Sequence, residues 1–200
     1  MKNLKNFFIQ SIEENIFLKK KLINFSNEVN QIIDVIHKTL KYKNKILICG
    51  NGGSAADAQH LSAEFLVRLR PNVNRRPLPI ISLALDTSTI TACGNDYNFD
   101  DLFARNFEAL AKKGDLLFCI STSGNSKNIL KVLKKANDMK INSISFLGNK
   151  GGKAKKLSKF NLIVPHSNTA RIQEAHIFLG HFILESVEKI LFKKWLNLKL

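Results

Sequence analysis

Five short apolar segments, separated by polar stretches, constrain the fold of this chain more than any other feature of its sequence. They lie at residues 45–50, 79–85, 115–121, 142–148 and 160–165. Most of them are separated by stretches long enough for a crossover helix, namely 54–68, 100–112 and 126–139. Strands that are apolar on both faces and alternate with helices are typical of a parallel sheet covered on both sides. We therefore expect an α/β fold, a three-layer sandwich around a five-stranded parallel sheet.

Helical periodicity marks both ends of the chain. Between residues 4 and 40, apolar side chains recur at spacings of three and four, which predicts one long or two consecutive amphipathic helices. The pattern is helical again from Ala170 to about Leu196. The segment between the fourth and fifth strands has room for a short helix at most. These apolar helix faces exceed what one sheet can cover, so they favour an oligomer.

The length of 200 residues is that of one domain, and 44% of the residues are apolar, enough for a real core. We expect a single domain over 1–200, in which 1–40 is a helical extension that packs in the oligomer. Residues 41–200 then form the α/β core and its C-terminal helix.

The charge, the cysteine content and the apolar runs of the chain restrict which binding partners and which cellular compartment we expect. The 31 basic and 16 acidic residues give a formal charge of +15, which raises nucleic acid as a partner, but the basic residues are spread along the chain without a run of five or six. Three cysteines without metal-type spacing are typical of buried thiols in a reducing compartment. The N-terminus lacks the apolar segment of a secretory signal, and no run approaches the ~18 residues of a membrane span. We expect a cytoplasmic protein with neither nucleic acid nor a membrane as partner.

The loops that follow the strands carry the candidate binding residues. Ligands of an open parallel sheet bind outside the carboxyl ends of its strands, which here read CGNGGSAADA, LDTSTI and ISTSGNSKNI. The first loop matches neither the dinucleotide fingerprint nor the Walker loop, so a nucleotide cofactor is poorly supported. The third loop holds four hydroxyl side chains between residues 121 and 126, whereas a helix cap needs one. We favour a cradle for a phosphate monoester over a simple cap.

Two helices carry further candidates. His60 and Glu64 are four residues apart on the first crossover helix, so they share a face one to two turns beyond the glycine loop. The alternative is an ordinary surface pair. Gln173 and His181 lie eight residues apart on the last helix, which corresponds to a rise of about 12 Å. If both serve one site, they lean toward each other or come from different subunits. We treat His176 as a structural core residue.

Taken together, four segments resemble the bacterial phosphoheptose isomerases, a family of the sugar isomerase (SIS) domain superfamily. The segments are GNGGSAADAQHLSAEF, DTSTITACGNDYNFDDLFAR, GDLLFCISTSGNSKNI and ARIQEAHIFLGH, in this order and spacing. The resemblance implies a flavodoxin-like SIS fold and a homotetramer with active sites between subunits. It implies conversion of the ketose sedoheptulose 7-phosphate into the aldose D-glycero-D-manno-heptose 7-phosphate, the first step toward activated heptose for lipopolysaccharide, capsule or glycoprotein.

The resemblance also assigns roles to residues. It implies one zinc ion per subunit, held by His60, Glu64, Gln173 and His181. We assign Glu64 as the general base at carbon and His181 as the acid or base at the sugar oxygens. The substrate contacts that it implies are Asn51, Gly52, Gly53, Ser54, Asn95, Asp96, Ser121, Thr122, Ser123, Ser126 and Gln173. For Asp96, a role as a turn residue is the alternative.

Two positions depart from the family pattern, and a relative offers another function. The family often has an acidic residue where this chain has Ala170, and a glycine where it has Asn98. The relative is the DnaA initiator-associating protein, which has the same fold, no isomerase activity and a replication initiator as partner. It lacks the matches to Glu64 and His181. Their presence here favours the enzyme over the non-catalytic partner protein.

Overall fold

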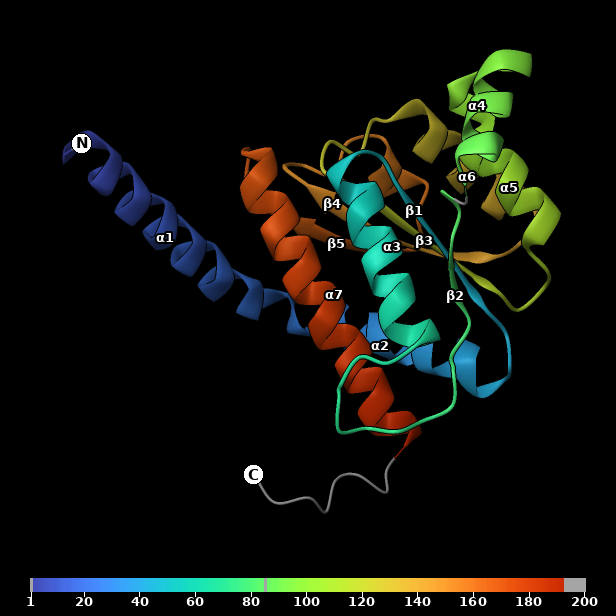
Figure 1. Ribbon diagram of the computed structural model, residues 1–200, viewed down its shortest axis with the longest axis horizontal. Coiled ribbons are helices and arrows are strands. Elements are labelled where there is room, and N and C mark those ends of the chain that lie inside the picture. The colour runs from blue at the N-terminus through green and yellow to red at the C-terminus, as the bar shows by residue number, and fades with distance from the viewer. Residues whose placement is uncertain (1, 85, 193–200) are drawn as a thin grey trace.

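The computed structural model describes residues 2–84 and 86–192 and contains one parallel sheet (Figure 1). Its strands are β1 (Ile46–Gly50), β2 (Ile80–Ser82), β3 (Leu116–Ser121), β4 (Asn142–Gly148) and β5 (Phe160–Val164). They are hydrogen-bonded in the order β2-β1-β3-β4-β5, and every pair is parallel. The predicted five-stranded parallel sheet is confirmed.

The edge strand β2 is shorter than the predicted segment 79–85. It has three residues, and its neighbour Pro79 has no N–H to donate to the ladder. The last residue of the predicted segment, Leu85, lies outside the described residues.

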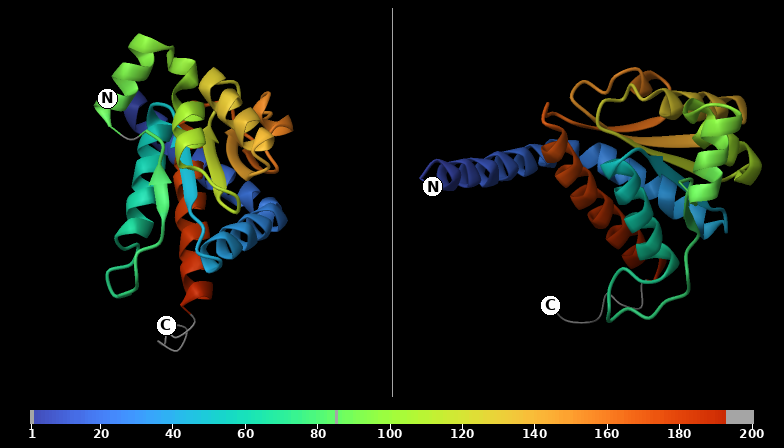
Figure 2. Two further views of the ribbon diagram at one scale, coloured as in Figure 1. Left: turned by 90° about the vertical axis from the view of Figure 1, so that its right-hand side faces the viewer. Right: turned by 45° about the horizontal axis from the view of Figure 1, so that its top comes forward.

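Helices cover both faces of the sheet, as the alternation of side chains along β1 shows. Ile46 and Ile48 belong to a core with α2 (Ser26–Lys41), α3 (Gly53–Leu66) and α7 (Thr169–Leu191). Leu47 and Cys49 belong to a second core with α4 (Thr87–Asp96), α5 (Leu102–Leu110) and α6 (Lys127–Asp138). The two faces are visible in the two views of Figure 2. The predicted three-layer sandwich is therefore confirmed.

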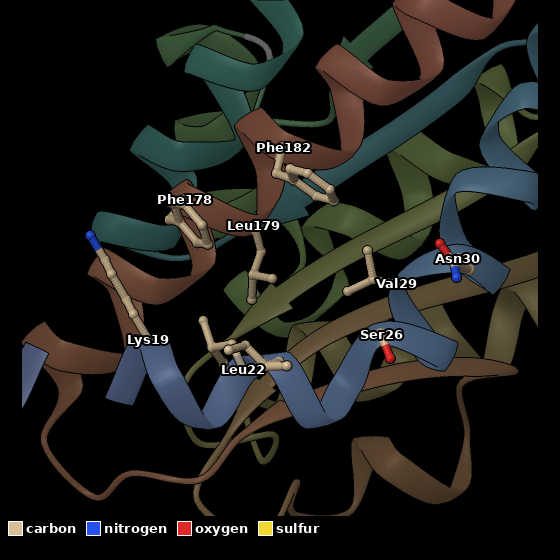
Figure 3. A pocket seen from close by; sticks show the side chains of 9 residues that line it. Lys19, Leu22, Ser26, Val29, Asn30, Phe178, Leu179 and Phe182 are labelled. Carbon is tan, nitrogen blue, oxygen red and sulfur yellow. The ribbon is translucent and has the colours of Figure 1, made fainter. Parts of the chain in front are cut away.

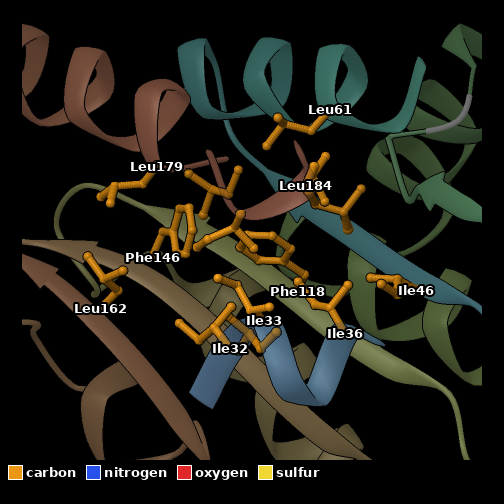
Figure 4. Close-up of a cluster of buried hydrophobic side chains, with 14 of the residues drawn as sticks. Ile32, Ile33, Ile36, Ile46, Leu61, Phe118, Phe146, Leu162, Leu179 and Leu184 are labelled. Atoms are coloured by element: carbon orange, nitrogen blue, oxygen red, sulfur yellow. The ribbon is translucent and has the colours of Figure 1, made fainter. Parts of the chain in front are cut away.

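The larger core contains an aromatic pair at its centre. The rings of Phe118 and Phe146 meet edge to face with centroids 4.7 Å apart, a favourable arrangement for aromatic side chains. Ile36 from α2 and Leu184 from α7 close over them from two sides (Figure 4). Burial of these side chains provides the hydrophobic stabilisation that fixes α2 and α7 against the sheet.

The predicted N-terminal extension consists of two helices. A single 3₁₀ turn, Ile23–Phe25, joins α1 (Lys2–Leu22) to α2, and α1 projects away from the body of the molecule (Figures 1 and 2). The predicted short helix between β4 and β5 is the 3₁₀ turn Ala154–Lys156. The predicted extension of α7 toward Leu196 lies, from residue 193 on, outside the described residues.

One helix was missed by the sequence reasoning, which treated the segment after β2 as a loop. α4 begins after Asp86, whose carboxylate accepts a hydrogen bond from the backbone N–H of Thr89 at 2.8 Å. Three threonines give this segment low helix propensity. The Asp86 cap therefore indicates a helix more strongly than the residues of the helix itself do. A 3₁₀ turn, Phe99–Asp101, links it to α5.

The three cysteines are buried free thiols, as predicted. Cys49 and Cys119 are register partners on β1 and β3, with their Sγ atoms 3.6 Å apart. Burial raises the pKa of the Cys119 thiol well above its ordinary value, and the neighbouring Cys49 raises it further. In the described part of the chain, no helix is both long and apolar enough to cross a membrane.

His176 is a buried structural histidine, as expected. Its side chain lies beneath α7, where Nε2 lies 3.1 Å from the carbonyl oxygen of Leu147 and donates to it. Burial lowers its pKa from 6.5 to about 4, which the bond to Leu147 partly opposes. The neutral ring is therefore the form that the fold accommodates.

Acidification should destabilise the protein through His176. Because the folded-state pKa lies below the unfolded value, this contribution is complete above pH 6.5 and is lost as pH falls toward about 4. The full effect is about 3 kcal/mol. We expect the His176→Gln variant, which keeps a donor for Leu147 but cannot titrate, to show a shallower loss of unfolding free energy between these pH values in urea titrations. Equal slopes for the variant and the parent would contradict this account.

Candidate active site

The turn from β1 into α3 has glycine at positions 50, 52 and 53. A Cβ on Gly50 would collide with the backbone carbonyl of Ser54, and Gly52 has a positive φ of 54°. A Cβ on Gly53 would lie 2.5 Å from Nε2 of Gln173 on α7. Of these glycines only Gly53 meets α7, where a Cβ would require the end of the Gln173 side chain to move, and α3 begins directly at Gly53.

The loop between β3 and α6 presents hydroxyl groups. Ser121 is buried and its Oγ accepts a hydrogen bond from the N–H of Gly124 at 3.2 Å. Ser126 occupies the N-cap position of α6, but its side chain makes no capping hydrogen bond. Ser123 is exposed and its Oγ accepts from the N–H of Asn125 at 3.1 Å. A simple cap therefore does not explain this loop.

Both loops line one cavity of about 310 Å³. It lies between the carboxyl ends of β1 and β3, where the strand order reverses and ligands of this fold class bind. The start of α3, the N-cap of α6 and the first residue of α7, Thr169, contribute to its wall. Helix N-termini attract anions through their free N–H groups and dipoles. The cavity walls are Asn51, Gly52, Gly53, Ser54, Ile120, Ser121, Thr122, Ser126, Thr169 and Gln173.

An amide pair that sequence reasoning missed joins the two loops. Asn51 donates to Oδ1 of Asn128 at 2.8 Å, and Asn128 donates to Oδ1 of Asn51 at 2.9 Å. Oδ1 of Asn128 also accepts from the N–H of Ile129 at 2.9 Å. Asn128 is buried in the first turn of α6, so it fixes the start of that helix against the glycine loop. The only sequence signal was an amide two residues after the N-cap.

Further along α3, a histidine, a glutamate and a second histidine meet. Nε2 of His60 lies 2.8 Å from Nε2 of His181 and 3.3 Å from Oε1 of Glu64. One ligand atom of each residue lies within 4.8 Å of the others. Oε2 of Glu64 is buried and has no hydrogen-bond partner. Two imidazoles and a carboxylate that has one oxygen without a hydrogen-bond partner are a ligand set that fits a divalent transition metal such as zinc.

The histidine environment favours a neutral ring at His181. Burial lowers its pKa, and the neighbouring His60 lowers it further, while Glu64 acts in the opposite direction. A neutral imidazole can bind a metal ion or accept a proton. Asp57, one turn before His60, has a buried Oδ2 without a partner, and burial raises its pKa to about 6, opposed by His60. Sequence reasoning did not single out Asp57.

The structure separates Gln173 from this cluster within one chain. α3 and α7 run side by side, so that Gly53 faces Gln173 and His60 faces His181. The cluster therefore lies seven residues, or about 10 Å, along α3 from the cavity wall at Gly53. The predicted grouping of Gln173 with the other three metal ligands is not formed within a single subunit and stays a prediction.

Three predicted substrate residues are not among the cavity walls: Ser123, which is exposed on the loop between β3 and α6, and Asn95 and Asp96. Asn95 and Asp96 end α4, where Asn95 donates to Oδ1 of Asp96 at 2.8 Å. Asp96 lines a separate pocket of about 200 Å³ together with Tyr97 and Arg105. Their contact with substrate stays a prediction.

The two departures from the family pattern are compatible with the fold. Asn98 has φ −159° and ψ 160°, an extended conformation that does not need glycine. The N–H of Ala170 donates to the capping side chain of Asn168 at 2.9 Å, so the start of α7 is capped without an acidic residue at position 170.

The parallel α/β sandwich has a cavity lined by helix N-termini at the reversal of strand order and a His-Glu-His cluster about 10 Å away along α3. These features are those expected of a sugar-phosphate-binding domain. Comparison with known proteins agrees: the SIS domain family matches residues 16–148. The phosphoheptose isomerase of Clostridium acetobutylicum is 44% identical over 94% of this chain and 97% of its own length. That of Aquifex aeolicus is 43% identical over 95% and 97%.

A solved structure of similar sequence has the same fold. The phosphoheptose isomerase of Neisseria gonorrhoeae superposes with a TM-score of 0.87 at 38% identity, covering 93% of this chain and 99% of that one. The chain therefore belongs to the phosphoheptose isomerase family and is an isomerase.

A carboxylate in place of the Asn128 amide should weaken binding in the cavity. Asn128→Asp removes the donor to Asn51 and puts a negative charge beside an anion site. A hydrogen bond to a charged group contributes ~1.5–3 kcal/mol. We therefore expect the Kd for a sugar phosphate to rise by about tenfold or more. Calorimetric titration measures this.

The matched control is Asn137→Asp at the opposite end of α6, where Asn137 donates to the carbonyl of Leu157. It should leave the Kd unchanged. Equal Kd values for Asn128→Asp and the parent would show that the cavity does not bind the anion.

Proposed function

We propose that this protein interconverts sedoheptulose 7-phosphate and D-glycero-D-manno-heptose 7-phosphate as an aldose-ketose isomerase. The observation that carries the proposal is the pairing of Glu64 and His181 on the helix pair that leads from the anion cradle. The separation of about 10 Å along α3 suits a substrate whose phosphate and reacting carbons lie at opposite ends of a seven-carbon chain. The names of the matched relatives point to the same substrate class.

The cradle would bind the phosphate, which does not react. Ser121, Thr122 and Ser126 offer hydroxyls, and the starts of α3 and α6 offer backbone N–H groups. Binding energy from such a remote group holds the reacting end in position and so contributes to turnover as well as affinity.

Isomerisation moves a proton between C1 and C2 and a second proton between the two oxygens. Glu64 accepts the carbon-bound proton from C1 of the ketose and returns it to C2. His181, neutral because burial and His60 lower its pKa, moves the proton between the sugar oxygens. This assignment gives each of the two side chains one type of proton transfer.

We also propose a zinc ion, one per subunit, held by His60, Glu64 and His181, with Gln173 as fourth ligand. The three clustered side chains fit it by donor type and spacing. When bound, the ion would polarise the sugar carbonyl as a Lewis acid. Glu64 has two carboxylate oxygens, and only Oε1 is close to His60, so metal binding and proton transfer need not use the same atom.

Turnover can be tested with the purified protein and sedoheptulose 7-phosphate in deuterated water. We expect the aldose to form with deuterium at C2, detected by NMR, and a chelator to lower the rate. Glu64→Gln should lower kcat by ~10²- to 10⁴-fold, because it removes a general base. A folded Glu64→Gln protein with parental kcat would rule out the base assignment, and absence of turnover by the parent would overturn the proposed reaction.

The non-catalytic partner protein is not favoured. The curated relatives described above are named as isomerases, and Glu64 and His181, the residues that distinguish the two possibilities, lie together in the structure.

We propose that the protein is a homotetramer whose active sites combine residues of different subunits. α1 exposes large apolar side chains, with Phe7, Phe8 and Phe17 each more than 60% exposed. Beside it, Phe178 and Phe182 of α7 line an open apolar pocket of about 290 Å³ at the α1–α2 junction (Figure 3). Exposed apolar surface of this kind marks an interaction site. A neighbouring subunit would supply the Gln173 that one chain keeps apart from His181.

Replacement of the aromatic side chains at this junction should weaken assembly. We expect the parent to sediment as a tetramer at micromolar concentration and the Phe178→Ser/Phe182→Ser variant to dissociate into smaller species, since each lost aromatic contact removes buried apolar area. Circular dichroism controls for folding. A monomeric parent would contradict the proposal of shared active sites.

The product is proposed to enter the synthesis of activated heptose, for lipopolysaccharide, capsule or another glycan. We also propose that the whole chain is one SIS domain and that it acts in the cytoplasm. The three buried free thiols are compatible with a reducing compartment.

A further inference from the structure

A buried ion network lies just beyond the His-Glu-His cluster. Glu188, on α7, has no exposed side-chain surface, and its two oxygens accept hydrogen bonds from two arginines of the segment between α3 and β2. Nε of Arg75 lies 2.5 Å from Oε2 of Glu188, and Nε of Arg70 lies 2.8 Å from Oε1. The side chain of Arg75 is also fully buried.

Arg75 also binds the backbone of the residue proposed as base. Its two terminal nitrogens donate to the carbonyl of Glu64 at 2.8 Å and to that of Phe65 at 2.9 Å. The last carbonyls of a helix have no partner within the helix, and a cation there is favoured by the helix dipole. The guanidinium of Arg75 thus caps the end of α3 at the residue whose carboxylate faces His60.

The same guanidinium connects α3 to the helix of His181. Glu188 lies seven residues, about two turns, after His181, so the two side chains share a face of α7. One arginine therefore joins the backbone of Glu64 to the helix that carries His181. The connecting segment, residues 67–79, contains no helix or strand and passes beneath the ends of α3 and α7 (Figure 1).

Stability alone does not account for this arrangement. Burial of a carboxylate and a guanidinium costs free energy of solvation that their attraction often fails to offset, and apolar side chains of similar volume are frequently as stable. A planar guanidinium, however, can donate in fixed directions to a carboxylate and two carbonyls at once, which neither lysine nor an apolar side chain can do.

We propose that Arg75 and Glu188 are positioning residues, which hold Glu64 and His181 at the separation that metal binding and proton transfer require. The inference rests on the proposed function for its catalytic consequence. Residues that orient metal ligands in this way typically affect metal affinity or activity by 10- to 100-fold when changed.

The test compares Arg75→Lys with a matched variant of a second buried ion pair, Asp115→Asn. Asp115, just before β3, is buried and binds Lys45, just before β1, so this pair lies at the amino ends of two inner strands, opposite the cavity. Zinc affinity is measured by calorimetric titration of the chelator-treated full-length protein, and kcat and KM by turnover of sedoheptulose 7-phosphate. We expect Arg75→Lys to weaken Zn²⁺ binding and lower kcat, each by about tenfold or more, with KM changed by less than about threefold. Asp115→Asn should lower the melting temperature and leave both quantities unchanged.

Parental zinc affinity in folded Arg75→Lys would overturn the inference, as would an equal loss in Asp115→Asn, which would reveal a general effect of stability. If Arg75→Lys does not fold, Glu188→Gln, which keeps the volume and one acceptor oxygen, provides the same comparison. Absence of turnover by the parent would refute the proposed function but leave the zinc titration to decide on the positioning role.

Discussion

The close parallel packing of α3 and α7 is the interaction on which the rest of the site depends. Glycines stand at two points where the helices lie close together: a Cβ on Gly53 would lie 2.5 Å from the side-chain end of Gln173, and one on Gly180 would lie 2.7 Å from that of Leu61, so in each case the neighbour would have to shift. Because the helices run in the same direction, one end of the pair forms the cavity wall and the middle brings His60 to His181. At the far end of the pair, Glu188 of α7 binds Arg70 and the buried Arg75 of the segment between α3 and β2. A side chain at Gly180 would require Leu61 to shift, directly beside the contact between His60 and His181.

Much of the fold could be predicted from the sequence because its signals are local. The five apolar segments, the crossover helices and the order of the loops follow from periodicity and from the exclusion of water from both faces of a parallel sheet. Helix α4 could not be predicted in this way, since its threonines favour other conformations and only the Asp86 cap and the tertiary context make it a helix.

The candidate site was predictable only in part, and the reason is physical. Loop residues such as Ser121 and Ser126 sit at strand ends, whose position topology determines, so their meeting in one cavity follows from the sheet. Asn128 and Arg75 act through hydrogen bonds to segments far away in the sequence, at Asn51 and Glu188, which no spacing in the sequence reveals. For Gln173 and His181, helix rise left two possibilities, a lean toward each other or a contribution from different subunits, and within one chain Gln173 lies at Gly53 while His181 lies at His60.

The walls of the cavity are uncharged, although the chain as a whole carries a formal charge of +15. Its attraction for a phosphate dianion would therefore come from backbone N–H groups and helix ends, which act over one helix turn, rather than from lysine or arginine charges, which act over the screening length of the solution. A net positive charge would accelerate the encounter with an anion, whereas the uncharged cavity would hold it through its shape and N–H groups. Added salt would then slow arrival of the substrate far more than it hastens departure, and a product bound without a fixed counter-charge can leave without breaking an ion pair.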